Sequence, residues 1–142
     1  MSVTASALEH AKDHLRRGAT TRIAVVGASN DPRKYGNIIV KDLQRRGYRI
    51  FPVNLHETTI AGLPVSRTLA DLPEPVDIVD VVTPPEVTKR ILKEAAAAGL
   101  PLVWLQDGSF DDAVLAQAEA APFATVAHAC IMVVAREVVA VR

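Results

Sequence analysis

The stretch from Ile23 to Gly36 contains the residue types that suit a phosphate group. It reads IAVVGASNDPRKYG, an apolar run followed by a glycine, small polar residues and a second glycine nine positions after the first. Gly27 carries no Cβ, so its backbone can turn sharply and approach a ligand closely. A helix expected to begin near Lys34 directs free N–H groups and the positive end of its dipole at the same corner. The stretch predicts a phosphate-binding loop, and the alternative is a plain turn between a strand and a helix.

The other side chains of this loop fit the same chemistry but not the dinucleotide fingerprint. Ser29 and Asn30 supply hydrogen-bond donors, and Arg33 and Lys34 add positive charge. Dinucleotide-binding folds use the glycine pattern G-x-G-x-x-G. Here Ala28 and Ser29 stand where the second glycine is expected, and extra residues precede the helix. The departure weakens an interpretation as an NAD site.

The end of the next expected strand also argues against NAD. An NAD site places Asp or Glu there to bind the ribose 2′-hydroxyl. This strand instead ends with Val53 and Asn54, and the nearest acid is Glu57. A neutral strand end tolerates a ribose that carries phosphate, as coenzyme A does at its 3′ position. For Asn54, the simpler explanation is a turn residue that bonds its own backbone.

Strands and helices alternate along the chain, and this alternation must position the loops. Apolar and β-branched segments predict strands over 22–26, 48–53, 75–82, 102–106 and 123–127. Helical spacing predicts helices over 4–17, 35–46, 84–98 and 111–121, with caps at Thr4 or Ser6, at Thr83, and at Ser109 or Asp111. The pattern favours an α/β fold: a doubly wound parallel sheet of about five strands with helices on both faces.

In such a sheet the ligand crevice lies outside the carboxyl ends of the strands, where the strand order reverses. The loops expected there are 27–37 and 83–86, and the strand before the second loop is expected beside the first strand. Trp104 and Gln106 alternate with Leu105, so they should face one helix layer and Leu105 the other. We expect Trp104 to pack in the core, and Gln106 could close the floor of the cleft and contact the ligand.

Composition and charge exclude several classes of protein. A chain of 142 residues makes one ordinary domain, expected as a packing helix over 1–19 and the main body over 20–142. Equal acidic and basic counts, 16 each, lack the basic excess of a nucleic-acid-binding protein. Cys130 stands alone, so neither a disulfide within the chain nor a Cys/His zinc site is expected. The absence of a secretory or membrane-spanning apolar run predicts a cytoplasmic protein.

The remaining polar residues have simple structural explanations. His128 is expected at the surface, and Asp111 and Asp112 suit the first turn of a helix. Cys130 is expected to pack as a small apolar residue, and a mixed disulfide with a thiol ligand is the alternative. The sequence contains no nucleophile elbow, Walker motif, metalloprotease helix or kinase motif, so no catalytic or metal-binding residue is expected.

The order and spacing of five segments resemble those of the small stand-alone CoA-binding proteins. These proteins are similar to the CoA-binding domain at the front of the succinyl-CoA synthetase alpha subunit. The segments are VVGASNDPRKYGN, LQRRGYRIFPVN, GLPVSRTLADLPEPVDIVDVVTPPE, VWLQDG and VAHACIMV, and they span roughly residues 20–135. The resemblance implies a Rossmann-like fold with the CoA pyrophosphate over Gly27, Ala28, Ser29, Tyr35 and Gly36. By the same resemblance, Val53 and Asn54 flank the adenosine, and Val82, Thr83 and Pro84 line the opposite wall.

Two places depart from the family pattern. Leu55 stands where proline usually follows the asparagine, and His56 is the nearest candidate for a basic residue that is common there. Near the end of the chain, His128 and Ala129 precede Cys130, where the family tends to show a polar residue and arginine.

The sequence as a whole predicts a non-catalytic CoA or acyl-CoA binding protein that acts as a carrier, a sensor or a partner subunit. No nucleic acid or membrane partner is expected, and a protein partner or a homo-oligomer fits the pattern. The alternatives are an NAD(P)-linked oxidoreductase-type domain, a regulatory interaction module with a vestigial CoA site, and a CoA-transferring enzyme completed by another chain. Replacing Gly27 with Val should block the approach to the pyrophosphate while the sheet stays folded.

Overall fold

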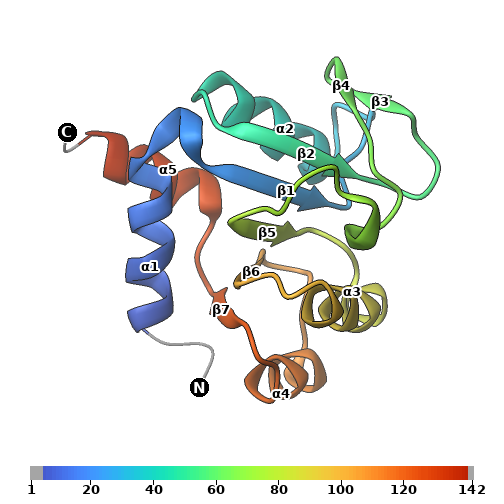
Figure 1. Cartoon of the computed structure of the whole chain (residues 1–142), viewed down its shortest axis with the longest axis vertical. Helices are drawn as coiled ribbons and strands as arrows, with labels where there is room; N and C mark the ends of the chain where they lie inside the picture. The colour runs from blue at the N-terminus through green and yellow to red at the C-terminus, as the bar shows by residue number, and fades with distance from the viewer. Residues whose placement is uncertain (1–4, 141–142) are drawn as a thin grey trace.

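Five parallel strands form the central sheet of the protein (Figure 1). The computed structural model describes residues 5–140. The strands are β1 (Arg22–Val26), β2 (Arg49–Val53), β5 (Ile78–Val81), β6 (Leu102–Leu105) and β7 (Ala124–Ala127). Their order in the sheet is β2-β1-β5-β6-β7, and every neighbouring pair is parallel. The expected doubly wound parallel sheet is confirmed.

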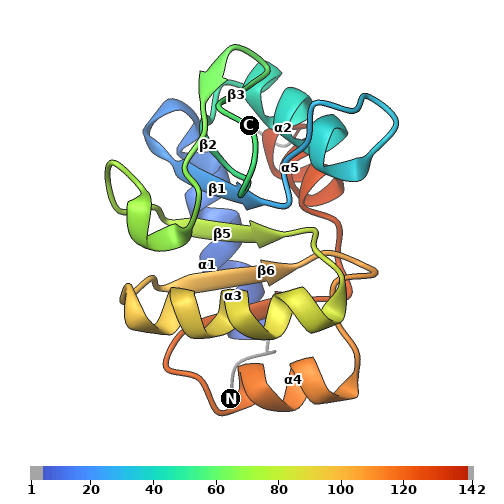
Figure 2. The same ribbon diagram turned by 90° about the vertical axis from the view of Figure 1, so that its right-hand side faces the viewer.

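Helices cover both faces of this sheet. On one face lie α1 (Ala5–Arg16), α2 (Tyr35–Arg45) and α5 (Ile131–Ala140), and on the other lie α3 (Pro85–Ala97) and α4 (Asp112–Glu119) (Figures 1 and 2). Alternate residues of each strand enter opposite layers, as Val25 and Val26 do. The core is therefore two apolar layers, one on each side of the sheet.

The first helix is tied to the sheet by its packing and by a hydrogen bond. Ala11 and Leu15 of α1 are fully buried, and the Tyr48 hydroxyl donates to the carbonyl oxygen of Leu15 at 2.7 Å. A short 3₁₀ turn, η1 (Gly18–Thr20), then leads into β1. The proposed division into 1–19 and 20–142 stays a prediction, and the expected cap at Thr4 lies outside the described residues.

Most element boundaries agree with the sequence prediction, but several features besides η1 differ. A small antiparallel hairpin, β3 (Thr59–Ile60) and β4 (Leu63–Pro64), a 3₁₀ turn, η2 (Leu69–Asp71), and helix α5 were not predicted. The α5 segment IMVVAREVVA is rich in β-branched residues, which favour strands, but its buried residues Ile131, Val134, Ala135 and Val138 follow helical spacing. The cap of α3 is Pro84, so the expectation of Thr83 was wrong by one residue, whereas Asp111 caps α4 by accepting from Val114 N–H.

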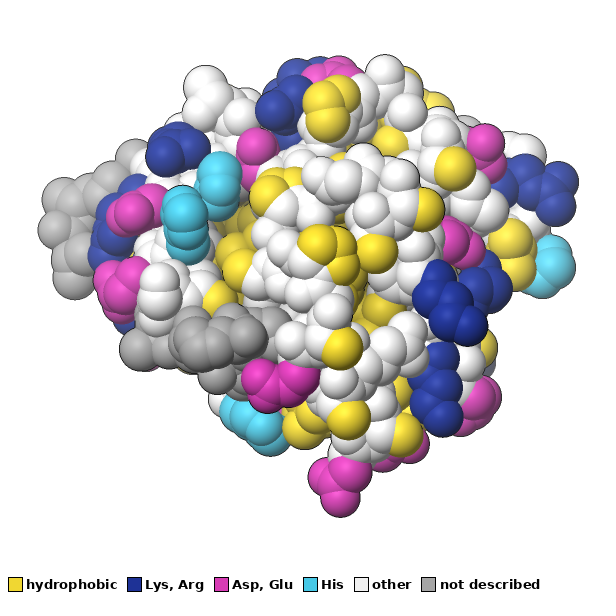
Figure 3. Space-filling model, turned by 60° about the horizontal axis from the view of Figure 1, so that its bottom comes forward, with side chains coloured by type: hydrophobic (Ala, Val, Ile, Leu, Met, Phe, Trp, Pro, Cys, Tyr) yellow, Lys and Arg dark blue, Asp and Glu magenta, His cyan; other side chains and the backbone are white. Residues whose placement is uncertain are grey.

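Side chains of both charges lie on one face of the protein (Figure 3). On the face shown in Figure 3, acidic and basic groups lie mainly around the rim, and the centre holds apolar and uncharged groups. This distribution agrees with the equal acidic and basic counts of the sequence.

Trp104 anchors the layer beneath α5. It is fully buried, and its indole Nε1–H donates to the carbonyl oxygen of Ala129 at 2.7 Å. Leu105 packs in the opposite layer, as the alternation on β6 predicted. The indole therefore fills the core and also fixes the chain just before α5 begins.

Asp80 is a carboxyl group in the middle of this apolar sheet. It lies on β5 between Val25 of β1 and Trp104 of β6 in the strand register, and its exposure is 0%. Neither carboxyl oxygen has a hydrogen-bond partner among the described residues. Burial raises the pKa of Asp80 well above its usual value, because a buried carboxylate loses its hydration.

The buried carboxyl predicts a pH-dependent stability. Because the pKa of Asp80 is raised in the folded state, its contribution is fully present below the unfolded pKa of about 4 and is lost as pH rises through the folded pKa. Asp80→Asn cannot ionise, so the wild type should lose about 1.4 kcal/mol relative to this variant for each pH unit within that window. Denaturant unfolding of both proteins between pH 4 and pH 8 measures the difference. Parallel stability curves would show that Asp80 is solvated or paired.

Candidate ligand-binding site

The loop after β1 and the first turn of α2 are in direct backbone contact. A Cβ built on Gly36 would lie 2.0 Å from the carbonyl oxygen of Gly27, so no side chain fits at position 36. Gly27 has a φ of +94°, a conformation that favours glycine, and its N–H donates to the carbonyl oxygen of Val53 at 3.2 Å. The two glycines allow the helix to start directly on the end of the strand.

Helix α2 presents an open N-terminus at this contact. Lys34 occupies the N-cap position, but its side chain makes no capping hydrogen bond. Within the described residues the N–H groups of Tyr35 and Gly36 have no acceptor, whereas Asn37 N–H donates to the Lys34 carbonyl at 3.0 Å. The helix has 11 residues, so its dipole adds to these free donors. This corner can therefore hold an anion.

Two asparagine side chains hold the loop in place from opposite sides. Asn37 Nδ2 donates to the carbonyl oxygen of Ser29, and Asn54 Nδ2 donates to the carbonyl oxygen of Ala28, both at 2.9 Å. The Ser29 hydroxyl accepts from Asp31 N–H at 3.0 Å. These bonds give the carbonyls of Ala28 and Ser29 their partners and hold this part of the loop against α2 and the end of β2.

The charges beside the loop are partly compensated. Arg33 is 88% exposed and pairs with Asp31 at 3.0 Å. Hydrogen bonds from Arg33 lower the pKa of Asp31. Lys34 is exposed and has no ion pair among the described residues, so it is the cation of this loop that is available to a ligand.

The turn after β2 has a structural explanation. Asn54 Oδ1 accepts from the N–H groups of His56 at 2.7 Å and Glu57 at 3.0 Å, so the side chain closes the turn as expected for asparagine. Asn30 was expected as a donor to the ligand, but its Nδ2 donates to Glu57 Oε1 and to the Thr59 carbonyl oxygen, both at 2.9 Å. Ligand contact at Asn54 stays a prediction.

A cavity of about 380 Å³ lies between the ends of β1 and β2 and the first turns of α3. Its size falls in the range of small-molecule sites. Gly27 and Asn54 form one side, and Thr83 and Pro84 form the other. Figure 2 shows the loops after β1 and β5 together at the right-hand edge of the sheet, where the strands end. The two loops expected at the reversal of strand order are thus brought together.

The cavity also has cationic residues that the sequence analysis missed. Arg67 and Arg90 line it together with His56. Arg67 follows Ser66, which pairs in parallel with Val53, and Arg90 lies on α3. No local motif brings these positions together, so only the fold reveals them.

The other polar residues at this edge of the sheet differ in burial and in the contacts that they make. Gln106 is only 1% exposed, and its Oε1 accepts from Ile131 N–H at 3.0 Å, so it holds the start of α5. Tyr35 is 46% exposed, with its hydroxyl 3.7 Å from Cys130 Sγ, and this contact raises the pKa of Tyr35. His128 is exposed and packs edge-on against Phe110. Ligand contact at Gln106 stays a prediction.

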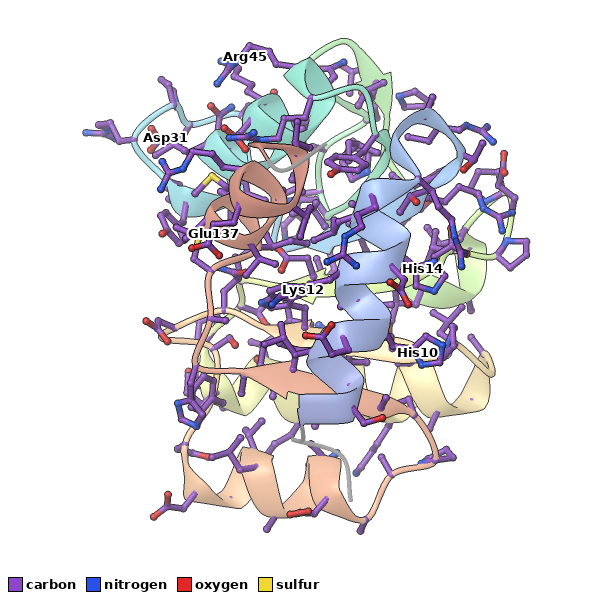
Figure 4. All side chains as sticks on the ribbon, turned by 90° about the vertical axis from the view of Figure 1, so that its left-hand side faces the viewer. His10, Lys12, His14, Asp31, Arg45 and Glu137 are labelled. Carbon is purple, nitrogen blue, oxygen red and sulfur yellow. The ribbon has the colours of Figure 1, made fainter. Side chains whose placement is uncertain are left out.

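The other histidines of the fold lie away from this edge. His10 and His14 stack on α1, with ring centroids 6.1 Å apart, and Figure 4 shows both on the opposite side from Asp31. Residues 5–140 contain no group of three or more side chains arranged to hold a metal ion. None of their helices is long and apolar enough to cross a membrane.

The residues predicted from the sequence thus fall into five places. The first corner holds the loop and helix start, at Gly27, Ala28, Ser29, Lys34, Tyr35 and Gly36. Val53 and Asn54 end β2 on one side of the cavity, Thr83 and Pro84 lie on its other side, and Val82 hydrogen-bonds to β1 beneath Gly27. Gln106 lies under α5.

Several known proteins are similar to this chain in sequence. The alpha subunit of the ADP-forming acetate–CoA ligase II of Pyrococcus furiosus is 33% identical over 91 residues, which are 63% of this chain and 20% of that subunit. The uncharacterized protein YneT of Bacillus subtilis is 33% identical over 97 residues, which are 68% of this chain and 70% of YneT. The chain therefore spans about a fifth of the ligase subunit.

Solved structures give the same result. A conserved hypothetical protein of Pyrococcus furiosus superposes with a TM-score of 0.77 at 41% identity, covering 80% of this chain and 97% of that one. The family model of the CoA binding domain matches residues 21–136. The resemblance drawn from the five sequence segments is confirmed, and the chain belongs to the CoA-binding domain family.

Proposed function

We propose that this protein binds CoA or an acyl-CoA at the corner where α2 begins on the β1 loop. The observation that carries the proposal is the contact of Gly36 with the Gly27 carbonyl, which brings uncapped helix N–H groups to the edge of a cavity. A pyrophosphate needs such clustered donors and a close backbone approach. The cavity beside it provides room for the adenosine end.

The role that fits these residues is binding without chemistry of its own. Three polar side chains at the corner have structural roles: Asn37 and Asn54 hold the loop, and Ser29 accepts from Asp31 N–H. The protein would then act as a carrier, a sensor or a partner subunit. With its one cysteine half-buried and free, the cytoplasm is the compartment that suits it.

A second candidate is a CoA-holding component of a larger ligase. It is favoured by the match to an ADP-forming acetate–CoA ligase alpha subunit, of which this chain spans 20%. In that case the chemistry would need a further chain, and CoA binding would be the contribution of this one. Both candidates require the same site.

The choice of ligand tests the proposed function directly. Because β2 ends at Val53 and is followed by Asn54 rather than an acid, CoA and acetyl-CoA should bind with micromolar or tighter affinity, and NAD should bind weakly. Isothermal titration with CoA, acetyl-CoA, NAD and NADP in one buffer measures this, after a mass spectrum has checked for ligand carried through purification. Tight NAD binding, with CoA displaced from the same site, would favour the oxidoreductase alternative.

A substitution at Tyr35 tests whether the free N–H groups of α2 bind the ligand. Tyr35→Pro removes one free N–H at the first helical position, where proline is favoured, and the extended backbone of Lys34 (φ −91°, ψ 146°) accepts a following proline. Losing one charge-assisted hydrogen bond should weaken CoA binding by about 10- to 100-fold.

Tyr35→Ala is the matched control, because it removes the same side chain but keeps the N–H. If the two variants bind CoA equally, the pyrophosphate does not sit on this helix. Gly27→Val is a less selective probe, since a Cβ at Gly27 would lie 3.0 Å from Val82 Cγ2 and 3.1 Å from Thr83 Cγ2. That substitution strains the loop itself.

A further inference from the structure

The cavity between β2 and α3 contains a concentration of positive charge. Arg67, Arg90 and His56 line it, and no Asp or Glu is among its lining residues. The chain as a whole has 16 acidic and 16 basic residues, so this acid-free lining is a local departure from its balance. Two arginines at a cavity without acidic lining residues favour an anionic ligand group.

Arg67 is held at this place by backbone pairing. Ser66 N–H donates to the Pro52 carbonyl, and Asn54 N–H donates to the Ser66 carbonyl, both at 3.0 Å. These bonds put Arg67 beside the end of β2, the position from which dinucleotide folds read the ribose. Arg67 is exposed, and residues 5–140 provide it with no ion pair or hydrogen bond. Its guanidinium is available to a ligand.

Arg90 is oriented from the other side by Glu94. The Arg90 guanidinium donates to Glu94 Oε2 at 2.7 Å, while Glu94 Oε1 accepts from Leu69 N–H at 3.2 Å. The same carboxylate therefore links α3 to the segment that follows Arg67. The side chain of Arg90 remains 46% exposed, so it has donors left for a second anion.

We propose that Arg67 and Arg90 together bind a phosphomonoester on the ribose of an adenine nucleotide, here the 3′-phosphate of CoA. This inference rests on the proposed function and adds that the site recognises the ribose phosphate of the ligand. Arginine matches a phosphate through parallel N–H donors, and a ribose phosphate at a strand end without an acid needs such a partner. The sequence offered His56 as the nearest candidate for a basic residue after β2, and in the structure Arg67 and Arg90 supply positive charge at this place.

The test compares ligands that differ only in the phosphate. Wild-type protein, Arg67→Gln, Arg90→Gln and the double variant are titrated calorimetrically with CoA and with dephospho-CoA. The wild type should prefer CoA by about tenfold or more, each single variant should reduce the preference, and the double variant should bind both ligands alike. Arg45→Gln is the control, because Arg45 is an exposed arginine at the far end of α2 (Figure 4) and should keep the wild-type preference.

The outcomes separate the inference from the proposed function. Equal wild-type affinity for CoA and dephospho-CoA, or a preference that survives in the double variant, overturns the arginine assignment while CoA binding stands. If neither ligand binds, the proposed function fails and this inference fails with it. NADP and NAD are titrated in parallel, because a 2′-phosphate offers the same chemistry. Suppose that the wild type binds no CoA but prefers NADP over NAD, and that the arginine variants lose this preference. That result would assign Arg67 and Arg90 to the phosphate of a dinucleotide and would overturn the assignment to CoA.

Discussion

The contact between two glycines determines how the candidate binding edge of this protein is built. With 2.0 Å between a virtual Cβ on Gly36 and the Gly27 carbonyl oxygen, α2 can begin only if position 36 has no side chain. The helix axis, the direction of its free N–H groups and the shape of the loop all follow from that closeness. Any other residue at position 36 would push the helix away from the strand end and would separate the donors from the cavity.

The rest of the edge is assembled around this contact by side chains from distant parts of the chain. Asn37 holds the loop from α2, and Asn54 holds it from the end of β2. Thr83 comes from the neighbouring strand end, where its hydroxyl is 2.8 Å from that of Thr88 in α3. Three strand ends therefore contribute to one rigid rim, and a ligand that binds there pays little to order it.

The sequence was sufficient for the features that depend on local pattern. The alternation of apolar and capped segments predicted the sheet, and the run ending at Gly27 predicted the loop, because both follow from nearby residues. The sequence was not sufficient where residues far apart in the chain determine the position of a side chain. Arg67 reaches the site only through the pairing of Ser66 with β2, and Gln106, expected in the cleft, is drawn under α5 by the N–H of Ile131. The spacing of residues along the sequence does not indicate such long-range partners.

The acid-free lining of the cavity also has a consequence for the speed of capture. In a molecule with equal numbers of acidic and basic residues, long-range attraction is weak, so a local positive field is what an approaching polyanion meets. Encounters would be guided to this edge from about one Debye length, roughly 8 Å at physiological ionic strength. Residence time would instead be governed by the short-range donors at the helix start. Under the proposed function, the groups that govern arrival of the ligand would thus differ from those that govern its departure.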